Sequence, residues 1–375
     1  MSRKRIRLAL FIGSLGGGGA QRHVSLLAPR LDRSRFDVLV LCRERRGEYL
    51  RELEDAGIEV VEIASRGPLY GPSSLRAVVR LARLVRERRI DVLHSLLFEC
   101  NVQAILATRL SRGTLVVAGL RNMDDKYSSL RMSLYVAVLR LADRIVAVSD
   151  PVKERFAERG VPSERIEVVE NGIELESPRG GASLETAEQA LGGRLPGRPI
   201  VVTLASLHPR KGLDHLLRAA KQVVTAFPGT HFLICGEGPE RARLESLRAE
   251  LGLQSVVLLP GAVRAVREVL ASSDLFVLSS LEEGMSNALL EAHAEGIPAV
   301  VTDVGANSRV VEHGVTGLVV PPASPEALAN AIRSILAAPD TRRRMGAAAR
   351  ERIGAHFTLD AMVHRMEAAY ESVAR

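Results

Sequence analysis

The sequence predicts an α/β protein of two Rossmann-like domains, each a doubly wound parallel sheet, which face each other across a central cleft. Three observations lead to this prediction. Apolar runs of β type alternate with helical patterns along nearly the whole chain. A single segment rich in Gly, Pro and Ser interrupts the alternation. The chain has 375 residues, 46% of them hydrophobic, which is enough for two cores.

Seven apolar runs in the first half are predicted strands. Segments with a helical period, such as residues 75–89, separate them. Strands that are almost continuously apolar are usually covered on both faces, so a parallel sheet between two helical layers is expected. The predicted strands are residues 7–13, 37–42, 57–63, 90–96, 114–120, 144–149 and 165–172.

The alternation stops at residues 176–199 and then starts again, which predicts a second domain of the same architecture. Three helical patterns, near 324–337, 340–354 and 359–374, end the chain. Ligands of open α/β sheets bind outside the carboxyl ends of the strands, so an interdomain site is expected. The strands predicted here are residues 199–206, 230–238, 255–261, 274–280, 297–303 and 316–322.

Composition narrows the class of protein. No uninterrupted apolar run is long enough to cross a bilayer, and the N-terminal stretch lacks the features of a signal peptide, so a mature cytosolic protein is expected. The three cysteines, Cys42, Cys100 and Cys235, show no paired spacing. They indicate reduced core residues, and neither a disulfide framework nor a zinc site.

The positive charge is concentrated in the first half of the chain. Residues 1–180 hold 31 Lys and Arg against 23 Asp and Glu, whereas the whole chain has a net charge of +7. Such a half suits a phosphorylated substrate, an anionic membrane surface or nucleic acid. An arginine-rich but merely solvated surface is an equally good interpretation of the excess.

Four glycines, residues 16–19, stand between the first strand and a helical pattern. Glycines at such a turn let the backbone approach a ligand and direct helix N–H groups at an anion. The spacing departs from G-x-G-x-x-G, and the basic stretch LCRERR stands where an acidic ribose-binding residue would follow the second strand. Close approach by a substrate is therefore favoured over a dinucleotide cofactor.

Two loops of the second domain carry polar residues after a strand. Beyond Ser206, the loop holds Arg210 and Lys211, whose positive charge can neutralise an oxyanion in a cleft. A solvated loop lysine is the alternative. After the next strand, Gly236 and Gly238 form a tight turn that serves either the fold or a ligand.

The stretch EEGMSNALLE, residues 282–291, joins a strand to a helix. Ser286 or Asn287 can cap that helix, which places Glu283 in the preceding loop and Glu291 about two turns inside. Helix amides attract phosphate beside Gly284, while the carboxylates suit neutral hydroxyls. A nucleotide sugar has a diphosphate between two hydroxyl-rich rings and fits this pattern. Dipole compensation alone would explain Glu283 but not Glu291.

These motifs together resemble the retaining GT-B glycosyltransferases of family GT4. EGMSNALLEA is similar to the family's E-x7-E motif. The order of the other motifs along the chain also matches the family; these motifs are GGGGAQRHV, DVLHS, AVSD, VVENGI, LHPRKGLD, GEGPE and HGVTGLVVPP. The resemblance covers nearly the whole chain. It implies an acceptor-binding domain at 1–176, a linker at 177–198, a nucleotide-sugar-binding domain at 199–356 and a helix at 357–375 that packs back towards the first domain.

The resemblance also implies roles for individual residues. Lys211 resembles the lysine that holds the donor diphosphate, Glu283 the carboxylate near the sugar hydroxyls, and Glu291 the one that binds the ribose. Gly284 and Met285 offer backbone amides to sugar and phosphate. The residues expected to bind the donor are Gly17, Gly18, Ser206, Arg210, Lys211, Gly236, Gly238, Glu283, Gly284, Met285, Ser286, Asn287 and Glu291.

The chain departs from the family pattern at three places. Ser206 stands where a second diphosphate cation, an arginine, is common, and Arg210 is expected to substitute for it. Arg121 and Asn122 stand where many members have an active-site histidine, and Arg309 stands where a glutamate is frequent.

His94 ends a predicted strand and is interpreted either as a cleft residue or as a core histidine. The expected catalytic residues are Lys211, Glu283 and His94, and the expected acceptor-side residues are Arg121, Asn122 and His23.

The predicted reaction is transfer of a sugar from a nucleoside diphosphate sugar to a hydroxyl with retention of configuration. Glu283 and Glu291 are unlike the facing carboxylates of a hydrolase, so a same-face mechanism is expected. A nucleotide-sugar epimerase of the same architecture is one alternative. A noncatalytic basic binding module is another, and it leaves the two glutamates unexplained.

We expect a UDP-sugar or GDP-sugar donor and no metal or other cofactor. The expected acceptor is a glycan, a lipid-linked acceptor or a small molecule, in bacterial surface polysaccharide or glycoconjugate assembly. Peripheral contact with the anionic inner face of the plasma membrane is expected, and nucleic acid is not.

Overall fold

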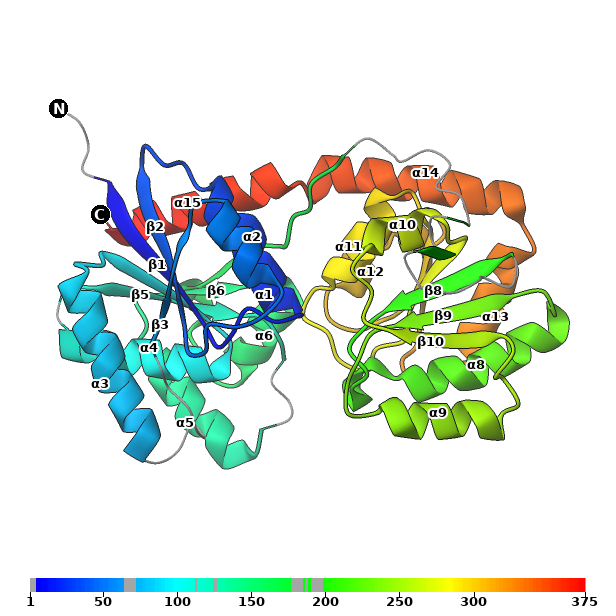
Figure 1. Ribbon diagram of the computed structural model, residues 1–375, viewed down its shortest axis with the longest axis horizontal. Helices are drawn as coiled ribbons and strands as arrows, with labels where there is room; N and C mark the ends of the chain where they lie inside the picture. The colour runs from blue at the N-terminus through cyan, green and yellow to red at the C-terminus, as the bar shows by residue number, and fades with distance from the viewer. Residues whose placement is uncertain are drawn as a thin grey trace. The chain divides into compact units, whose positions relative to one another are not determined.

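The chain folds into two compact units. In this computed structural model the described residues are 5–63, 72–111, 113–123, 127–176, 185, 188–189 and 198–374. Unit 1 comprises Met1–Gly172 and Leu359–Arg375, and unit 2 comprises Ile173–Thr358 (Figure 1). The predicted linker, 177–198, lies mostly outside the described residues.

Unit 1 contains a parallel sheet of seven strands in the order β3-β2-β1-β4-β5-β6-β7. Strands β1 and β4 pair directly, with Leu10 opposite His94, and the chain order reverses between them. Each of the seven strands predicted for this half is present. The strands are β1 (Ile6–Ile12), β2 (Phe36–Cys42), β3 (Glu59–Glu62), β4 (Val92–Leu96), β5 (Leu115–Leu120), β6 (Arg144–Ala147) and β7 (Ile166–Val168).

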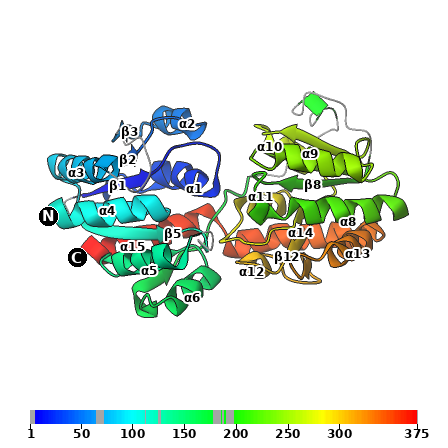
Figure 2. The ribbon, with the colours of Figure 1, turned by 90° about the horizontal axis from the view of Figure 1, so that it is seen from below.

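Helices cover both faces of this sheet, as its almost continuously apolar strands require. Figures 1 and 2 show α3, α4 and α5 on one face and α1, α2 and α15 on the other. Alternate residues of β1 (Leu8, Leu10 and Ile12) pack with α1 and α15 in one core cluster. The helices are α1 (Gly19–Leu27), α2 (Tyr49–Asp55), α3 (Pro72–Glu87), α4 (Phe98–Ser111), α5 (Ser129–Leu139), α6 (Asp150–Glu158) and α15 (Leu359–Ala374).

Unit 2 contains a parallel sheet of six strands in the order β10-β9-β8-β11-β12-β13, with the reversal between β8 and β11. The six strands predicted for the second half are all present, so the prediction of two Rossmann-like parallel-sheet domains is confirmed. The strands are β8 (Ile200–Leu204), β9 (His231–Cys235), β10 (Val257–Gly261), β11 (Leu275–Leu278), β12 (Ala299–Thr302) and β13 (Gly317–Val320).

The sheet of unit 2 is also sandwiched between helices. Figure 1 shows α8, α9 and α13 on one face and α10, α11 and α12 on the other. The first three helices share one apolar core with the strands. The helices are α8 (Leu213–Ala226), α9 (Arg241–Glu250), α10 (Val266–Ala271), α11 (Asn287–Ala294), α12 (Asn307–Val310), α13 (Pro325–Leu336) and α14 (Pro339–His356); short 3₁₀ turns lie at η1 (Ala28–Arg30), η2 (Ser163–Arg165) and η3 (Pro209–Lys211).

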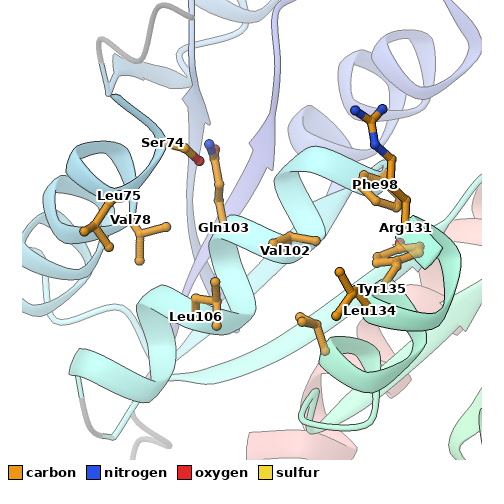
Figure 3. Close-up of a pocket in the computed structure, with 11 residues that line it drawn as sticks. Ser74, Leu75, Val78, Phe98, Val102, Gln103, Leu106, Arg131, Leu134 and Tyr135 are labelled. Atoms are coloured by element: carbon orange, nitrogen blue, oxygen red, sulfur yellow. The ribbon is translucent and has the colours of Figure 1, made fainter. Parts of the chain in front are cut away.

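On one face of unit 1, α4 packs between α3 and α5. Side chains from the three helices line a pocket of about 340 Å³ (Figure 3). Within the described part of the chain, no helix is long and apolar enough to cross a membrane. Cys42, Cys100 and Cys235 are buried and unpaired, as predicted.

The last helix, α15, supplies part of the core of unit 1 although the whole of unit 2 precedes it in the chain. One face of α15 joins β1, β2 and α1 in the apolar cluster. Its contributing residues are Leu359, Met362, Val363, Met366 and Tyr370. The core of the first-formed half is therefore completed by the final residues of the sequence.

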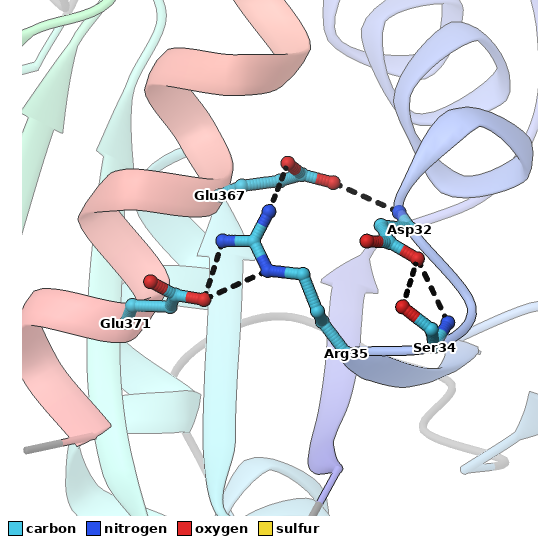
Figure 4. A network of polar contacts seen from close by, with 5 residues as sticks. All are labelled: Asp32, Ser34, Arg35, Glu367 and Glu371. Atoms are coloured by element: carbon cyan, nitrogen blue, oxygen red, sulfur yellow. Dashed lines mark hydrogen bonds and ion pairs between the residues drawn. The ribbon is translucent and has the colours of Figure 1, made fainter. Parts of the chain in front are cut away.

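Polar contacts anchor α15 beside this core (Figure 4). The Glu367 carboxylate accepts hydrogen bonds from the Asp32 backbone N–H at 2.8 Å and from the Arg35 guanidinium at 2.9 Å. Glu371 accepts a further bond from Arg35 Nε at 2.8 Å. The Glu367 side chain is 4% exposed and that of Glu371 is 22% exposed, so Glu367 is the more shielded anchor.

Replacing Glu367→Ala is expected to lower the free energy of unfolding by about 2 kcal/mol, because the Asp32 N–H and half of the Arg35 guanidinium lose their hydrogen bonds to a carboxylate that is itself almost buried. Glu371→Ala serves as the control and should cost less than about 1 kcal/mol, since its ion pair is more hydrated. Urea unfolding followed by circular dichroism measures both. Equal losses would show that Glu367 is not the principal anchor.

Candidate active site

The predicted donor-binding residues of unit 2 gather at the carboxyl ends of β8 and β11, where the strand order reverses. Lys211 ends the 3₁₀ turn η3 that follows β8, and Glu283 lies in the loop that follows β11. Because β8 and β11 are parallel neighbours, their carboxyl ends lie at the same edge of the sheet. Open α/β sheets bind ligands at such a point.

Lys211 and Glu283 form a buried ion pair. The lysine Nζ donates to Glu283 Oε1, and the two side chains are 12% and 6% exposed. Ser280 Oγ donates a second hydrogen bond to the same carboxylate oxygen, at 2.8 Å. The two charges are thus oriented by short contacts in a place where water screens them weakly.

Backbone hydrogen bonds join the loop that carries Lys211 to the loop that carries Glu283. The carbonyl oxygen of Arg210 accepts from the N–H groups of Leu281 and Glu282, at 2.7 and 3.3 Å. Ser279 Oγ donates to the carbonyl oxygen of Lys211 at 3.0 Å. The ion pair therefore stands on two loops that are fixed to each other.

The N-terminus of α11 lies directly after this pair. Ser286 caps the helix, since its Oγ accepts from Leu289 N–H at 3.3 Å, as one of the two predicted possibilities. Gly284 and Met285 are buried between Glu283 and the cap. The backbone N–H groups at a helix N-terminus form the positive end of the helix dipole, which favours an anion here.

Glu291 lies closer to the start of the helix than predicted. Because α11 begins at Asn287, Glu291 is four residues further on, just over one turn inside, where two turns were expected. Its side chain is half-buried. The predicted cap at Ser286 was right, but Glu291 is only five residues beyond it, which at about 3.6 residues per turn is less than two turns.

The backbone of Gly305 packs closely against the backbone of Glu283. Gly305 has φ +55°, and a Cβ built on it would lie 2.3 Å from the carbonyl oxygen of Glu283. The neighbouring Ala306 N–H donates to the carbonyl oxygen of Gly284 at 3.0 Å. Only glycine at position 305 allows this packing without displacing the backbone of Glu283.

The other predicted residues of unit 2 surround the same edge of the sheet. Ser206 is exposed and Arg210 is half-buried. The turn with Gly236 and Gly238 contacts the loop after β8, since Leu207 N–H donates to the carbonyl oxygen of Glu237 at 2.9 Å. Arg309 extends elsewhere, with its guanidinium 5.6 Å from the centre of the Phe357 ring.

The remaining predicted residues belong to unit 1. Gly17 and Gly18 are exposed in the loop that follows β1, and Gly18 precedes α1 with no side-chain cap on the helix. His23, on α1, is 2% exposed, as is His94 on β4. Arg121 and Asn122 follow β5 and are partly buried.

His94 belongs to a buried cluster in unit 1. Its Nδ1 shares a hydrogen bond of 2.7 Å with the Tyr370 hydroxyl on α15, while its Nε2 is buried without a partner among the described residues. Burial, followed by the charge of Arg121, lowers the pKa of His94 to about 3. The neutral ring at physiological pH positions Tyr370, and a catalytic role for His94 stays a prediction.

Arg121 and His23 lie close to this cluster. The Arg121 guanidinium donates to Asn171 Oδ1, and burial lowers the pKa of Arg121 to about 10. Burial, followed by the charges of Arg121 and His94, holds the pKa of His23 well below its usual range, which the neighbouring Asn171 side chain opposes. Because His94 and His23 stay neutral, Arg121 is the cation of this cluster.

Three residues of these sites were not singled out from the sequence. Ser280 and Asn171 contact predicted site residues. Each lies within three residues of the carboxyl end of a strand, which is the signal that could have identified them. Tyr370 gives no such signal, because it lies on the last helix, far along the chain from His94. Among the described residues, no three His, Cys, Asp or Glu side chains form a metal-binding group.

Two family models match the chain. The model for glycosyltransferase family 4 matches residues 17–177, and the model for glycosyl transferases group 1 matches residues 188–352.

Two bacterial relatives illustrate the similarity in sequence. A GDP-mannose-dependent α-(1-6)-phosphatidylinositol monomannoside mannosyltransferase of Mycobacterium tuberculosis is 30% identical over 327 residues, 83% of each chain. A UDP-Gal:α-D-GlcNAc-diphosphoundecaprenol α-1,3-galactosyltransferase of Escherichia coli is 24% identical over 302 residues, 77% of each chain.

Solved structures show the same fold. The crystal structure of Anabaena HepE with UDP and glucose aligns with a TM-score of 0.87 over 98% of this chain and all of that chain, at 21% identity. The sucrose-phosphate synthase of Thermosynechococcus elongatus aligns with a TM-score of 0.82 over 98% of this chain and 99% of that one, at 22% identity.

Replacing Gly305→Ala is expected to lower the free energy of unfolding by about 2–4 kcal/mol, since the methyl group meets the Glu283 carbonyl in a left-handed backbone. The matched control is Gly314→Ala, at φ +80° with no atom within 4 Å of the new Cβ. It should cost only about 1 kcal/mol. Urea unfolding measures both variants, and equal losses would mean that the loop yields freely.

The histidine cluster predicts a loss of stability in acid. Because the pKa of His94 is about 3 in the folded state, the unfolded chain takes up a proton below about pH 6.5 that the folded chain refuses until about pH 3. Between about pH 6.5 and pH 5, the free energy of unfolding of the wild type should therefore fall by about 2 kcal/mol more than that of His94→Gln. Urea unfolding at several pH values measures this, and parallel losses in both proteins would contradict it.

Proposed function

The chain belongs to the GT4 family of GT-B glycosyltransferases, and from that premise we propose that it transfers a sugar from a nucleoside diphosphate sugar to a hydroxyl group with retention of configuration. The observation that carries the proposal is the buried Lys211–Glu283 pair beside the N-terminus of α11. It offers a cation for a diphosphate and a carboxylate for sugar hydroxyls at one edge of one sheet.

Donor binding requires the two charges to exchange partners. The Lys211 ammonium would leave the Glu283 carboxylate and bind the donor diphosphate, assisted by the amides of Gly284 and Met285. Glu283 would keep its bond from Ser280 and accept from a hydroxyl of the donor sugar. A salt bridge in the free enzyme preorganises both side chains, so that little reorganisation is needed when the donor arrives.

The same cation supports bond breaking. As the bond between the anomeric carbon and the phosphate oxygen breaks, negative charge grows on the diphosphate, and Lys211 with the helix amides stabilises it. The acceptor oxygen forms the new bond on the same face, and its proton passes to an oxygen of the leaving diphosphate. The step therefore needs no carboxylate nucleophile. Glu283, in the loop before α11, is assigned to the donor sugar and Glu291, in the helix, to the ribose, so the two are not assigned to opposite faces of one sugar.

Positive charge in this proposal comes from Lys211 and from Arg210, which takes the place of the family's usual arginine near Ser206. The proposed step therefore uses no metal. Arg210 is half-buried in the loop that is bonded to the Glu283 loop, which supports its assignment. Binding of the ribose is assigned to Glu291.

The donor is proposed to be a UDP-hexose or GDP-hexose, and the acceptor a lipid-linked glycan or glycolipid. The two bacterial relatives support this range, since one is named for GDP-mannose and a phosphatidylinositol monomannoside, and the other for UDP-galactose and a diphosphoundecaprenol sugar. The excess of Lys and Arg in residues 1–180 suits an acceptor with phosphate groups at the anionic inner face of the plasma membrane. A role in surface polysaccharide or glycolipid assembly follows.

A thermal-shift panel of nucleotide sugars tests the donor site. One donor, either a UDP-hexose or a GDP-hexose, should raise the melting temperature of the wild type, because it binds only the folded protein. Lys211→Ala and Glu291→Ala should abolish the shift. Arg210→Ala should lower the affinity for the donor by about tenfold and so reduce the shift. The matched control Arg218→Ala, an exposed arginine of α8, should behave as the wild type.

Product analysis then separates the finer claims. With the identified donor and a lipid-linked acceptor, nuclear magnetic resonance should show the donor's anomeric configuration in the product, and added EDTA should leave the rate unchanged. An inverted product would refute the same-face step. Loss of turnover in EDTA that a divalent cation restores would refute the metal-free step, and no shift with any nucleotide sugar would refute the donor site.

A further inference from the structure

The outer surface of α3, α4 and α5 exposes an unusual concentration of apolar side chains. Six of the ten large hydrophobic residues that are exposed in the described part of the chain lie on these three helices. Leu75 is 67% exposed, Leu130 72% and Leu134 57%. The six, which with the neighbouring arginines we call the α3–α5 surface, are Leu75, Val79, Leu106, Leu110, Leu130 and Leu134.

Such exposure is not needed to build the sheet. On α3 the residues Ala77, Val78, Leu81, Ala82 and Val85 already face inwards and are buried. The outward leucines therefore form a second apolar face on helices whose first face is satisfied by the core. Exposed apolar side chains that gather on three neighbouring helices, several of them around one pocket, indicate a binding surface.

The α3–α5 surface also contains a cavity. Figure 3 shows the pocket of about 340 Å³, with Leu75 and Val78 of α3, Val102 and Leu106 of α4, and Leu134 of α5 around it. Almost all of these lining groups are hydrocarbon. A space of this size and character takes a hydrocarbon chain better than a polar ligand.

One polar side chain is buried in the wall of the pocket. Gln103 of α4 is fully buried, and neither its Nε2 nor its Oε1 has a hydrogen-bond partner among the described residues. In Figure 3 it points from α4 towards α3, where Ser74 lines the same pocket. An unsatisfied buried amide is costly, so a ligand atom that accepts or donates a hydrogen bond would stabilise it.

The charged side chains of α3, α4 and α5 indicate the kind of partner that this surface binds. By sequence the three helices carry the six arginines Arg76, Arg80, Arg83, Arg86, Arg109 and Arg131, and the two acids Glu87 and Glu99. The Glu99 carboxylate is bound by Arg43, and Arg109 donates to the Leu141 carbonyl oxygen and to Asp143. The three helices then carry five other arginines and one other acid, Glu87. The arginines alternate with the leucines in sequence, as Leu75 with Arg76 and Leu130 with Arg131 show.

We propose that the α3–α5 surface docks on an anionic phospholipid bilayer and that a lipid acyl chain enters the pocket. The leucines enter the outer acyl region, and the long arginine side chains extend from between them to the lipid phosphates. Gln103 donates a hydrogen bond to an ester carbonyl of the inserted lipid. A bilayer is favoured over a protein partner, because a protein interface concentrates apolar groups in a centre with charge at the rim, whereas here the two alternate.

This proposal concerns a surface of unit 1 and does not depend on glycosyl transfer. Failure of the bilayer test leaves the donor site untouched, and loss of the donor site leaves this surface untouched. The two can therefore be judged separately with the same purified protein.

The chain contains no tryptophan, so a single introduced one reports on its surroundings without background. Leu134→Trp places the probe on the α3–α5 surface, and Val315→Trp, at a 47% exposed site of unit 2, is the matched control. Vesicles of equal parts phosphatidylcholine and phosphatidylglycerol should shift the emission of Leu134→Trp to shorter wavelength and leave Val315→Trp unchanged. Vesicles of phosphatidylcholine alone should produce little shift.

Vesicle sedimentation measures the contributions of leucine and arginine. The double variant Leu130→Ser with Leu134→Ser should lower the partition coefficient by about tenfold or more, and Val315→Ser should not change it. Arg76→Ala with Arg83→Ala should lower it by about tenfold on anionic vesicles at low salt, and Arg218→Ala should have no effect. Because all these side chains are exposed, circular dichroism should show unchanged folding.

Gln103→Leu tests the pocket itself. It should lower the partition coefficient by about threefold while the melting temperature stays the same or rises, because a purely structural amide would not affect lipid binding. An unchanged partition coefficient would overturn the lipid's entry into the pocket. Equal shifts of both tryptophans, no shift of either, or equal binding to both vesicle types would overturn the docking on an anionic bilayer.

Discussion

The organisation of the second unit depends on the hydrogen bonds and the ion pair that join the loop after β8 to the loop after β11. Parallel pairing of these two strands brings the loops to one edge, and the Arg210 carbonyl, Ser279 and the Lys211–Glu283 pair hold them together. The start of α11, the turn at Gly305 and the cap at Ser286 are built around that junction. Opposite charges kept apart from water at a helix N-terminus give a site that is electrostatically prepared before any ligand arrives.

The periodic features of the fold could be predicted from the sequence because they are local. All thirteen strand segments were predictable, since a parallel strand buried on both faces is apolar throughout, and the cap at Ser286 has a short-range signal. The meeting of Lys211 with Glu283 followed from topology once the sheet was accepted, although their direct contact did not. The depth of Glu291 in the helix was overestimated although the cap was predicted, since only five residues separate Glu291 from Ser286.

Contacts between distant segments were beyond such reasoning. Nothing near Tyr370 in the sequence indicates that its hydroxyl reaches His94, and nothing near Asp32 indicates that its N–H is bound by Glu367. The exposed leucines of α3 and α5 were equally hidden, because an amphipathic period does not reveal that apolar residues also occupy the outward face. Both the buried histidine cluster and the α3–α5 surface emerge only when the helices have been placed on the sheet.

The place of α15 in unit 1 has a consequence for biosynthesis. When residue 172 has left the ribosome, the first unit still lacks Met362, Met366 and Tyr370 of its core and the carboxylate that binds Arg35. The part of its sheet that α15 covers is then apolar and exposed while the whole of unit 2 is being made. Apolar surface that is exposed in this way makes a folding chain prone to aggregation and a target for chaperones. The N-terminal half of the sequence is therefore synthesised first but completed last.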